Sequence, residues 1–409
     1  MAPDAYAQGD MATPTFDADA PLPGPPDPWA STSQPSWRDG PPYHMTDMIA
    51  AEPAIAERLI ARLADPAGAA AELAREVTDA VGAGSPVVIT GCGTSDHAAQ
   101  AVAAILRSEL RTGGHLVRSA QAFELSLDPR PSGLVIGVSH EGATTATNAA
   151  LEAAGAAGSR TALITVTRRS PGAALVDLVV ETEELDQSWC NTVGYLSPIV
   201  AATAMAAHLA GGEPLSGASA RALLTQDGTD DEGIDWIAGR LASSREILVI
   251  ASGADRPAGR ELVLKIEEGS WVPAAYRDLE TFLHGHLAAT SEDTGLVLIL
   301  TDRERRPERL ARALAVLRAA RIVGSDTAAI LAARADAAVP ADLTSAGRLL
   351  VDEAPDLPSP VAALLGSAVP LQLLAERIAR ARGVNPDAIH REVDRYRAAA
   401  DAAESPEVA

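Results

Sequence analysis

Short apolar runs that end in polar turns containing glycine recur along the chain from about residue 45 onward. The clearest example is residues 133–151, GLVIGVSHEGATTATNAAL, in which an apolar run stops at Ser139 and a helical pattern begins at Thr144. Such a run with β-branched residues predicts a buried strand, and Thr144 is a residue type that caps helices. The free N–H groups of a helix start favour an anion or a sugar in the turn. The same residue types also cap ordinary helices, so this turn alone does not establish a site.

The alternation of strand and helix patterns continues on both sides of this turn. Strands are expected at residues 87–90, 114–119, 134–138, 161–167 and 178–183, and helices at residues 69–81 and 197–210. This alternation predicts a parallel sheet that is covered by helices on both faces. Residues 48–63 have apolar residues at broadly helical spacing, interrupted by Pro53, and predict an amphipathic helix packed on the main body or at a subunit boundary.

The second half of the chain repeats the first. Four pairs of segments correspond in the same order. VVITGCGT at residue 87 corresponds to ILVIASGAD at residue 247, and GLVIGVSHEG at residue 133 corresponds to GLVLILTDRE at residue 295. TALITVT at residue 161 corresponds to RIVGSD at residue 321, and SPIVAATAMAAHLA at residue 197 corresponds to SPVAALLGSAVPLQLLA at residue 359. The four offsets are all about 160 residues, which indicates a duplicated domain. The predicted fold class is therefore α/β, with two tandem domains that are each a doubly wound, flavodoxin-like parallel sheet flanked by helices.

The predicted domain boundaries follow from changes in composition. Residues 1–44 are rich in Pro, Ala, Asp and Ser without a hydrophobic period and are expected to form a disordered tail. Two domains are expected at residues 45–215 and 230–385, joined by a polar linker at residues 211–233, and residues 386–409 are expected to form a C-terminal tail.

Composition narrows the class of partner. The net charge of −22 argues against a nucleic-acid or anionic-membrane partner and fits a soluble cytoplasmic protein with a small-molecule ligand. No secretory signal pattern is present, and the longest apolar run, residues 196–210, is too short to span a bilayer and contains Pro198 and His208. The two cysteines, Cys92 and Cys190, can form neither a disulfide framework nor a four-cysteine metal site.

Three motifs resemble those of the double sugar isomerase (SIS) domain family, which includes the isomerase half of glucosamine-6-phosphate synthase. Gly-Cys-Gly-Thr-Ser at residues 91–95 resembles the first sugar loop, and Ser-His-Glu-Gly-Ala-Thr at residues 139–144 occupies the place of the second. Residues 261–268, followed by Leu-His-Gly at residues 283–285, resemble the catalytic helix and the His-Gly loop of the family. The order and spacing match over roughly residues 45–400. The resemblance implies two SIS-type domains with no metal and no cofactor, and without the glutaminase domain of the synthase.

The resemblance also implies roles for individual residues in an aldose–ketose interconversion. Glu268 would be the base that moves a proton between C1 and C2, and Lys265, on the same helix face, would be the positive group near the developing charge. His284 would open the sugar ring and would reach into the neighbouring subunit, which implies a homodimer with a shared active site. The side chains expected to contact a sugar or sugar phosphate are Thr94, Ser95, Ser139, His140, Glu141 and Thr144.

Two departures from the family pattern leave alternatives open. Glu141 stands where the family commonly has a serine that contacts phosphate, and a carboxylate there would repel a phosphate. Either Glu141 turns away, or the ligand lacks a phosphate, or the ligand has a cationic or hydroxyl-rich group there. The C-terminal segment lacks the lysine that the synthase places near the reaction centre, and His390 or Arg391 could replace it or only dock the segment. The prediction is an isomerase, aminosugar aminotransferase or deglycase, and the alternative is a non-catalytic carbohydrate-binding or regulatory protein.

Overall fold

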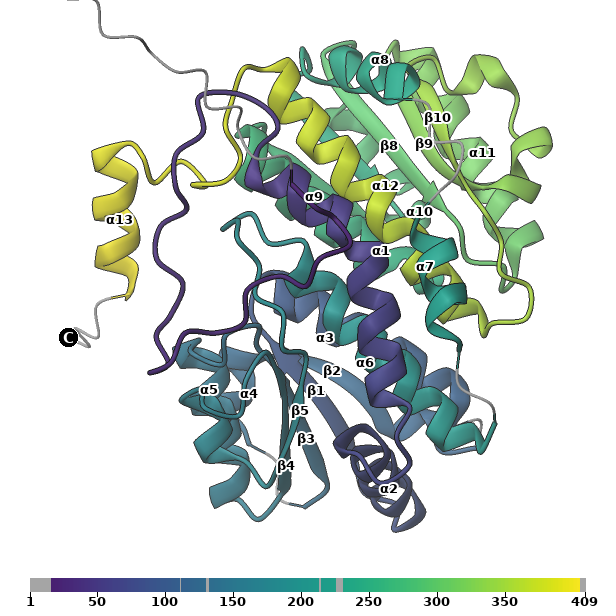
Figure 1. Cartoon of the computed structure of the whole chain (residues 1–409). Helices are drawn as coiled ribbons and strands as arrows, with labels where there is room; N and C mark the ends of the chain where they lie inside the picture. Colours follow the sequence, from purple (N-terminus) through teal and green to yellow (C-terminus); the bar gives the residue numbers. More distant parts are fainter. Residues whose placement is uncertain (1–15, 111, 130–131, 213–214, 226–230, 405–409) are drawn as a thin grey trace, which may run out of the picture.

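Each half of the chain forms a five-stranded, fully parallel sheet, and the two sheets have the same strand order (Figure 1). The computed structural model describes residues 16–404 except residues 111, 130–131, 213–214 and 226–230. The first sheet runs β2-β1-β3-β4-β5 and the second β7-β6-β8-β9-β10. The strands are β1 (Val87–Gly91), β2 (Val117–Gln121), β3 (Leu134–Val138), β4 (Arg160–Thr165), β5 (Leu178–Glu181), β6 (Glu246–Ile250), β7 (Ala274–Arg277), β8 (Thr294–Leu300), β9 (Asp326–Ala332) and β10 (Gly347–Val351). The shared order confirms the predicted α/β class and the duplication.

Helices cover both sheets and also fill the space between them (Figure 1). They are α1 (His44–Leu63), α2 (Ala69–Gly82), α3 (Thr94–Glu109), α4 (Ala122–Leu127), α5 (Thr145–Ala156), α6 (Val193–Ala210), α7 (Gly217–Thr225), α8 (Asp231–Leu241), α9 (Arg256–Ser270), α10 (Leu279–Leu283), α11 (Arg306–Val323), α12 (Ser359–Ala381) and α13 (Asp394–Glu404). Helices α3 and α6 of the first half contact α9 and α12 of the second, and one continuous apolar core contains side chains from both halves. The two units are therefore fixed against each other by a shared core.

Two of these helices, α6 and α12, are long and apolar enough to cross a membrane by length and composition. In the folded chain 78% of the apolar stretch of α6 and 83% of that of α12 is buried inside the protein. Helices that are apolar on all sides are expected in the middle of a large core, and these two lie between the sheets (Figure 1). Their composition is therefore explained by packing.

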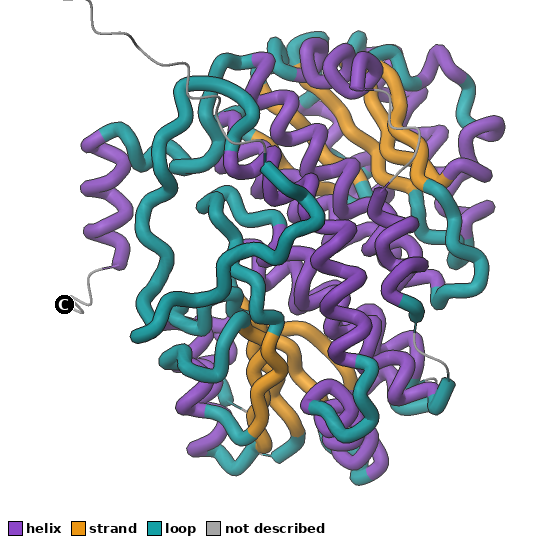
Figure 2. The backbone as a smooth tube through the Cα atoms, viewed as in Figure 1, coloured by secondary structure: helices purple, strands orange, loops and turns teal. Residues whose placement is uncertain are grey.

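The N-terminal segment differs from the expected disordered tail. Its described part, residues 16–43, runs as an extended loop over the first unit (Figure 2). Leu22 is buried against Met48, Ile55 and neighbouring apolar side chains, and its backbone N–H donates to Glu184 at 2.9 Å. Proline-rich sequence prevents a helix or an internal strand, but it leaves carbonyl groups free to accept hydrogen bonds from the body. Residues 1–15, the rest of the predicted tail, lie outside the described residues.

The structure also differs from two smaller predictions, the polar linker and the counterpart of β4. The segment predicted as a polar linker contains α7 and the start of α8. The expected counterpart of β4, RIVGSD from residue 321, instead lies at the end of α11, and the strand is the alanine-rich β9 that follows. Alanine has a high helix propensity and a low strand propensity, and only Thr327 and Ile330 of this strand are β-branched, so its signature in the sequence is weak.

Candidate functional site

Helix α9 carries two carboxylates and one lysine on a single face, at residues 261, 265 and 268. Their spacing of four and three residues places them on neighbouring turns of the helix. Lys265 Nζ lies 2.6 Å from Glu268 Oε2 and 3.6 Å from Glu261 Oε1. The side chains of Lys265 and Glu261 are fully buried, whereas that of Glu268 is 25% exposed. Of the two carboxylates, only Glu268 is therefore accessible to a ligand from outside.

Glu261 connects α9 to the first unit. Its Oε2 atom accepts a hydrogen bond from His97 Nδ1 at 2.7 Å, and its Oε1 atom accepts one from the Thr94 hydroxyl at 3.2 Å. Both donors lie in the first turn of α3, next to the predicted first sugar loop. Thr94 was expected to contact a ligand. In the structure its hydroxyl donates a hydrogen bond to the Glu261 carboxylate. The first sugar loop and the Lys265–Glu268 pair are thus brought to the same place.

Burial and the neighbouring charges shift the pKa values of the Glu261 and Glu268 carboxyls in opposite directions. Burial raises the pKa of the Glu268 carboxyl above its ordinary value, although the Lys265 ammonium opposes this shift. Burial acts in the same direction on Glu261, but Lys265, His97 and Thr94 outweigh it and lower the pKa of the Glu261 carboxyl. Burial acts to lower the pKa of Lys265, yet the adjacent carboxylates outweigh it and raise that pKa. Lys265 and Glu261 therefore stay charged, and Glu268 is the group poised to exchange a proton.

Cys190 and the C-terminal segment form the surroundings of Glu268. The Cys190 thiol lies 3.9 Å from Glu268 Oε2, and burial raises the pKa of that thiol well above its ordinary value, so it remains protonated. A Cβ atom added at Gly269 would lie 3.6 Å from Cys190 Sγ and 3.3 Å from Pro386 Cβ. Cys190 therefore acts as a neutral, weak hydrogen-bond donor, and Gly269 allows the C-terminal segment to approach α9 closely.

The second predicted loop follows β3 and ends at the start of α5. The Ser139 hydroxyl is buried and lies 3.4 Å from the Thr144 hydroxyl, and Thr144 is the N-cap residue of the helix. His140 Nε2 accepts a hydrogen bond from the Asp186 backbone N–H at 2.9 Å. Burial lowers the pKa of His140 to about 4, so this imidazole is neutral near pH 7. The structure thus places Ser139 and Thr144 together at a helix start and assigns His140 a structural hydrogen bond.

The contact made by Glu141 was not expected from the sequence. Its Oε2 atom accepts a hydrogen bond from the backbone N–H of Thr32, in the N-terminal segment, at 2.8 Å. The carboxylate is therefore directed to that segment. Of the three alternatives that the sequence left open, this geometry favours the one in which Glu141 turns away from a ligand.

The predicted ring-opening residue, His284, is not brought to Glu268 within one chain. It follows α10, its side chain is 76% exposed, and its Nε2 atom lies 3.2 Å from Glu280 Oε2. Within a single chain the described site therefore contains Lys265 and Glu268 without this histidine.

The C-terminal segment is held by ring stacking and by a cation–π contact. His390 is stacked between Trp271 and Tyr396, with ring centroids 3.6 and 3.8 Å apart. The Arg391 guanidinium lies over the Trp189 ring at 5.0 Å from its centroid. These contacts show docking for both residues that were considered as replacements for the family lysine.

The corresponding turns of the second sheet are closed by their own side chains. Asp255 accepts hydrogen bonds from the backbone N–H groups of Thr301 and Asp302 at 2.9 and 3.1 Å. In return, Asp302 accepts from the Ala254 N–H at 2.9 Å and from Arg309 at 2.6 Å. Two carboxylates therefore cap each other's loops at the edge where an open α/β sheet binds ligands.

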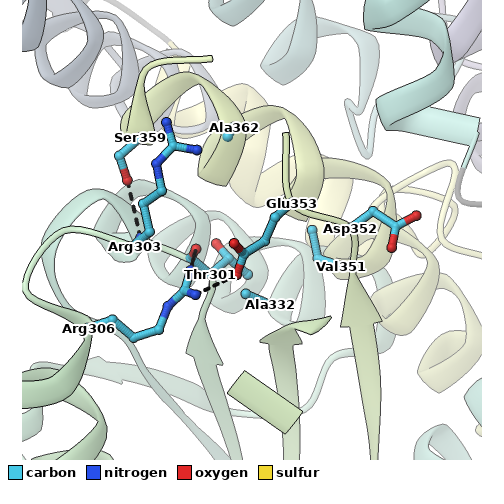
Figure 3. A pocket seen from close by; sticks show the side chains of 9 residues that line it. All are labelled: Thr301, Arg303, Arg306, Ala332, Val351, Asp352, Glu353, Ser359 and Ala362. Carbon is cyan, nitrogen blue, oxygen red and sulfur yellow. Dashed lines mark hydrogen bonds and ion pairs between the residues drawn. The ribbon is translucent and has the colours of Figure 1, made fainter. Parts of the chain in front are cut away.

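A small cavity lies beside these turns of the second sheet. Figure 3 shows Arg306 directed at Glu353, with which it forms an ion pair, and Arg303 close to Ser359. The remaining cavity is about 10 Å³, which is room for one water molecule. These turns of the second sheet are therefore occupied by their own side chains.

Comparison with known proteins agrees with this architecture. The family model described as "SIS domain" matches residues 85–210 and 240–338, which is one match for each sheet. The chain belongs to the SIS domain family. A SIS relative, glutamine–fructose-6-phosphate aminotransferase [isomerizing] from Gloeobacter violaceus, is 30% identical over 319 residues, covering 74% of this chain and 50% of the relative. The chain thus spans about half the length of this curated relative.

Solved SIS structures share the fold of this chain. The C-terminal domain of glucosamine-fructose-6-phosphate aminotransferase from Francisella tularensis superposes with a TM-score of 0.70 at 20% identity, covering 86% of this chain and 99% of that one. Tagatose-6-phosphate ketose/aldose isomerase from Escherichia coli gives a TM-score of 0.65 at 17% identity, covering 88% and 98%. These similarities support the tandem arrangement of two SIS units.

Sequence reasoning did not find two of the residues around the site. His97 lies two residues beyond the Gly-Cys-Gly-Thr-Ser motif, but its role depends on Glu261, which is distant in the sequence. The position of His97 three residues after Thr94, on the same face of α3, was the available signal. Thr32 lies in a segment with no hydrophobic period, and no local pattern predicts its contact with Glu141.

Proposed function

We propose that this protein is a sugar isomerase-type enzyme that moves a proton between C1 and C2 of an amino or keto sugar. The observation that carries the proposal is the Lys265–Glu268 pair, 2.6 Å apart, with Glu268 partly exposed beside the first sugar loop. A carboxylate whose pKa is raised by burial is suited to accept and return a proton near neutral pH.

The proposed reaction assigns a separate task to each group. Glu268 removes the C2 proton of the open-chain aldose and delivers it to C1, while a proton passes between O2 and O1, so that the product is an isomer of the substrate. The Lys265 ammonium stabilises the negative charge that develops on the enediolate oxygen. Glu261 is buried and fully hydrogen-bonded, and it is a positioning residue that holds Lys265 between the two carboxylates.

A phosphorylated sugar is the first ligand class to test. The named relatives act on fructose 6-phosphate and on tagatose 6-phosphate, as their names state. In this chain Ser139 and Thr144 lie at the start of α5, where backbone N–H groups and the helix dipole favour an anion. Glu141 is directed to Thr32, so its carboxylate does not point into this turn. Thr94 and Ser95 belong to the other loop of the same crevice.

We also propose a homodimer in the cytoplasm. His284 is exposed, and it follows a short helix away from Glu268 in its own chain. A second copy could therefore supply this histidine as the group that opens the sugar ring, and the site would be shared between subunits. Net charge and family membership support an intracellular role in sugar metabolism.

The test is deuterium exchange in D₂O, at C2 of an aldose and at C1 of a ketose, followed by proton NMR. The panel is fructose 6-phosphate, glucosamine 6-phosphate, glucose 6-phosphate and the three sugars without phosphate. Glu268→Gln keeps the shape of the side chain and removes the base, and we expect it to lower the rate by about 10² to 10⁴. The matched control is Glu267→Gln, the exposed neighbour on α9. Unchanged exchange in Glu268→Gln would refute the assignment of the base.

A second candidate is a carbohydrate-binding protein without catalysis. The observation that favours it is the exposed position of His284, which leaves a single chain without a ring-opening group. Saturable binding of a sugar by calorimetry, with no exchange or turnover at the concentration where the protein forms dimers, would support this candidate over the enzyme.

A further inference from the structure

Residues 22–32 follow the carboxyl edge of the first sheet, crossing three strands in spatial order. We call these residues the strap. Its first contact is beyond β5, where the Leu185 N–H donates to the Pro23 carbonyl at 3.1 Å. Beyond β4, the Arg169 guanidinium donates to the carbonyls of Pro25 and Pro26 at 3.0 and 3.1 Å. The last contact is beyond β3, between Thr32 and Glu141. The strap thus ends at the predicted second sugar loop.

The end of the strap coincides with the place where this sheet can bind a ligand. The strand order β2-β1-β3-β4-β5 reverses its direction between β1 and β3, and open α/β sheets bind ligands outside the carboxyl ends of the strands at such a point. The strap covers the strands on the β3 side of this crevice and stops at its rim. It is therefore placed as a side wall of the crevice.

The chain is anchored on both sides of the contact between Thr32 and Glu141. Leu22 is buried in an apolar cluster, and its N–H is bonded to Glu184. Beyond the strap, Arg38 forms an ion pair with Asp47 at 2.8 Å, and its carbonyl accepts from Asn385 at 3.0 Å. Between these anchors, Glu141 is the group of the sugar loop that holds the chain, through one charge-assisted hydrogen bond.

We infer that the strap is a wall of the sugar crevice and that Glu141 is a positioning residue, which acts on the ligand by holding Thr32 at the rim. This inference rests on the proposed function of the site. It explains why a carboxylate stands where the family commonly has a serine, because a carboxylate is the stronger acceptor for a backbone N–H. It also assigns residues 22–32 to the binding machinery, together with the two sugar loops and α9.

The test removes the hydrogen bond between Thr32 and Glu141 in the full-length chain, either at its donor or at its acceptor. Thr32→Pro deletes the donor, Glu141→Ala deletes the acceptor, and Glu141→Gln retains an acceptor. The probes are fructose 6-phosphate and fructose, measured by isothermal titration calorimetry. We expect the dissociation constant of the bound probe to rise about tenfold in Thr32→Pro and in Glu141→Ala, and to change little in Glu141→Gln. Gln34→Pro, at an exposed residue outside the strap, is the control for proline itself.

The double variant separates positioning from direct contact with the ligand. If Glu141 acts through Thr32, Glu141→Ala combined with Thr32→Pro binds the probe no more weakly than either single variant. Additive effects would show that Glu141 touches the ligand itself and would overturn the inference. Unchanged affinity in Thr32→Pro would overturn it as well.

Hydrogen exchange provides a readout that does not depend on the ligand. Amide exchange of peptides that span residues 22–36, measured by mass spectrometry without sugar, should accelerate in Thr32→Pro and Glu141→Ala but not in Glu141→Gln. If the wild-type protein binds neither probe and exchanges deuterium with none of the six sugars of the panel, the proposed function fails and the wall fails with it; if it exchanges with another sugar of the panel, that sugar replaces the probe. If the wild type binds a probe and exchange in the strap does not respond to the variants, only the wall is refuted.

Discussion

His97 Nδ1 donates a hydrogen bond to Glu261 Oε2 at 2.7 Å, and this contact joins the first turn of α3 to the middle of α9. Both residues are needed to keep Lys265 in place, because Glu261 lies 3.6 Å from its ammonium and is completely buried. A structural role of this pair can be separated from catalysis by measuring stability.

We expect Glu261→Ala to lower the free energy of unfolding by about 3 kcal/mol, because it removes the buried carboxylate shared by Thr94, His97 and Lys265 and leaves Lys265 with Glu268 as its remaining carboxylate partner. His97→Ala should cost about 1–2 kcal/mol, since Glu261 keeps its two other partners. Urea unfolding monitored by circular dichroism gives both values. The double variant should cost less than the sum of the single variants, and additivity would show that the pair is not coupled. Glu267→Ala, on the exposed face of α9, is the control, and it should lose no more than the one exposed hydrogen bond that Glu267 accepts from the Ala274 N–H.

The neutral state of His140 predicts a specific pH dependence of stability. Its pKa is lowered to about 4 in the fold, against about 6.5 in the unfolded chain, so the unfolded chain binds more protons between these values. The contribution of His140 is therefore complete above pH 6.5 and is lost as the pH falls towards 4. It amounts to about 3 kcal/mol. Asp186 and Asp255, whose pKa values are raised to about 6, act in the opposite direction over part of this range.

A variant isolates the contribution of His140 from those of the two aspartates. The difference in unfolding free energy between the wild type and His140→Asn should shrink by about 3 kcal/mol from pH 7 to pH 4. Chemical denaturation at several pH values measures it. A difference that stays constant over this range would mean that His140 is not held neutral. His286→Asn, at an exposed histidine, is the control for the substitution itself.

The proposed shared site predicts complementation between inactive variants. Glu268→Gln and His284→Ala should each be inactive as pure proteins. After unfolding and joint refolding, half of the dimers are mixed, and each mixed dimer has one complete site out of two, so about a quarter of wild-type activity should return. Mixing the folded dimers without exchange of subunits is the control. Failure to recover activity in verified mixed dimers would place His284 outside the site of its neighbour.

Alanine should lower the stability of the protein more at Gly142 than at Gly84. The φ angle of Gly142 is +66°, and an added Cβ atom would lie 2.2 Å from Ser170 Oγ. Gly84 has a similar φ of +72°, but an added Cβ atom would meet nothing within 4 Å. We expect Gly84→Ala to cost about 1 kcal/mol from backbone strain alone, and Gly142→Ala to cost about 2–4 kcal/mol because steric overlap is added. Thermal unfolding of both variants compares them, and equal losses would show that Ser170 moves aside without cost.

The sequence was sufficient for those parts of the fold that local chemistry determines. The apolar run at residues 134–138 predicted β3 to the residue, and the repeated segments predicted two sheets that proved to have the same strand order. The spacing of Lys265 and Glu268 predicted their pairing, because helix geometry alone brings such residues together.

The remaining features depend on contacts between distant residues. The course of residues 16–43 is set by bonds to groups more than 100 residues away, such as those of Leu22 with Glu184 and Thr32 with Glu141. A composition without periodicity resembles disorder when such partners are not known. The expected role of His284 concerns a second copy of the chain, so the contacts of one chain cannot test it.

Asp255 and Asp302 cap each other's turns, so the second sheet carries within its own sequence the negative charge that its loops would otherwise take from a solute. Of two copies that arose by duplication, one can therefore evolve as scaffold while the other keeps its exchange with small molecules. Selection on ligand preference should then act on the turns of the first sheet, and selection on folding alone should govern the matching turns of the second. Sequence drift at equivalent positions in the two halves is expected to follow these different pressures.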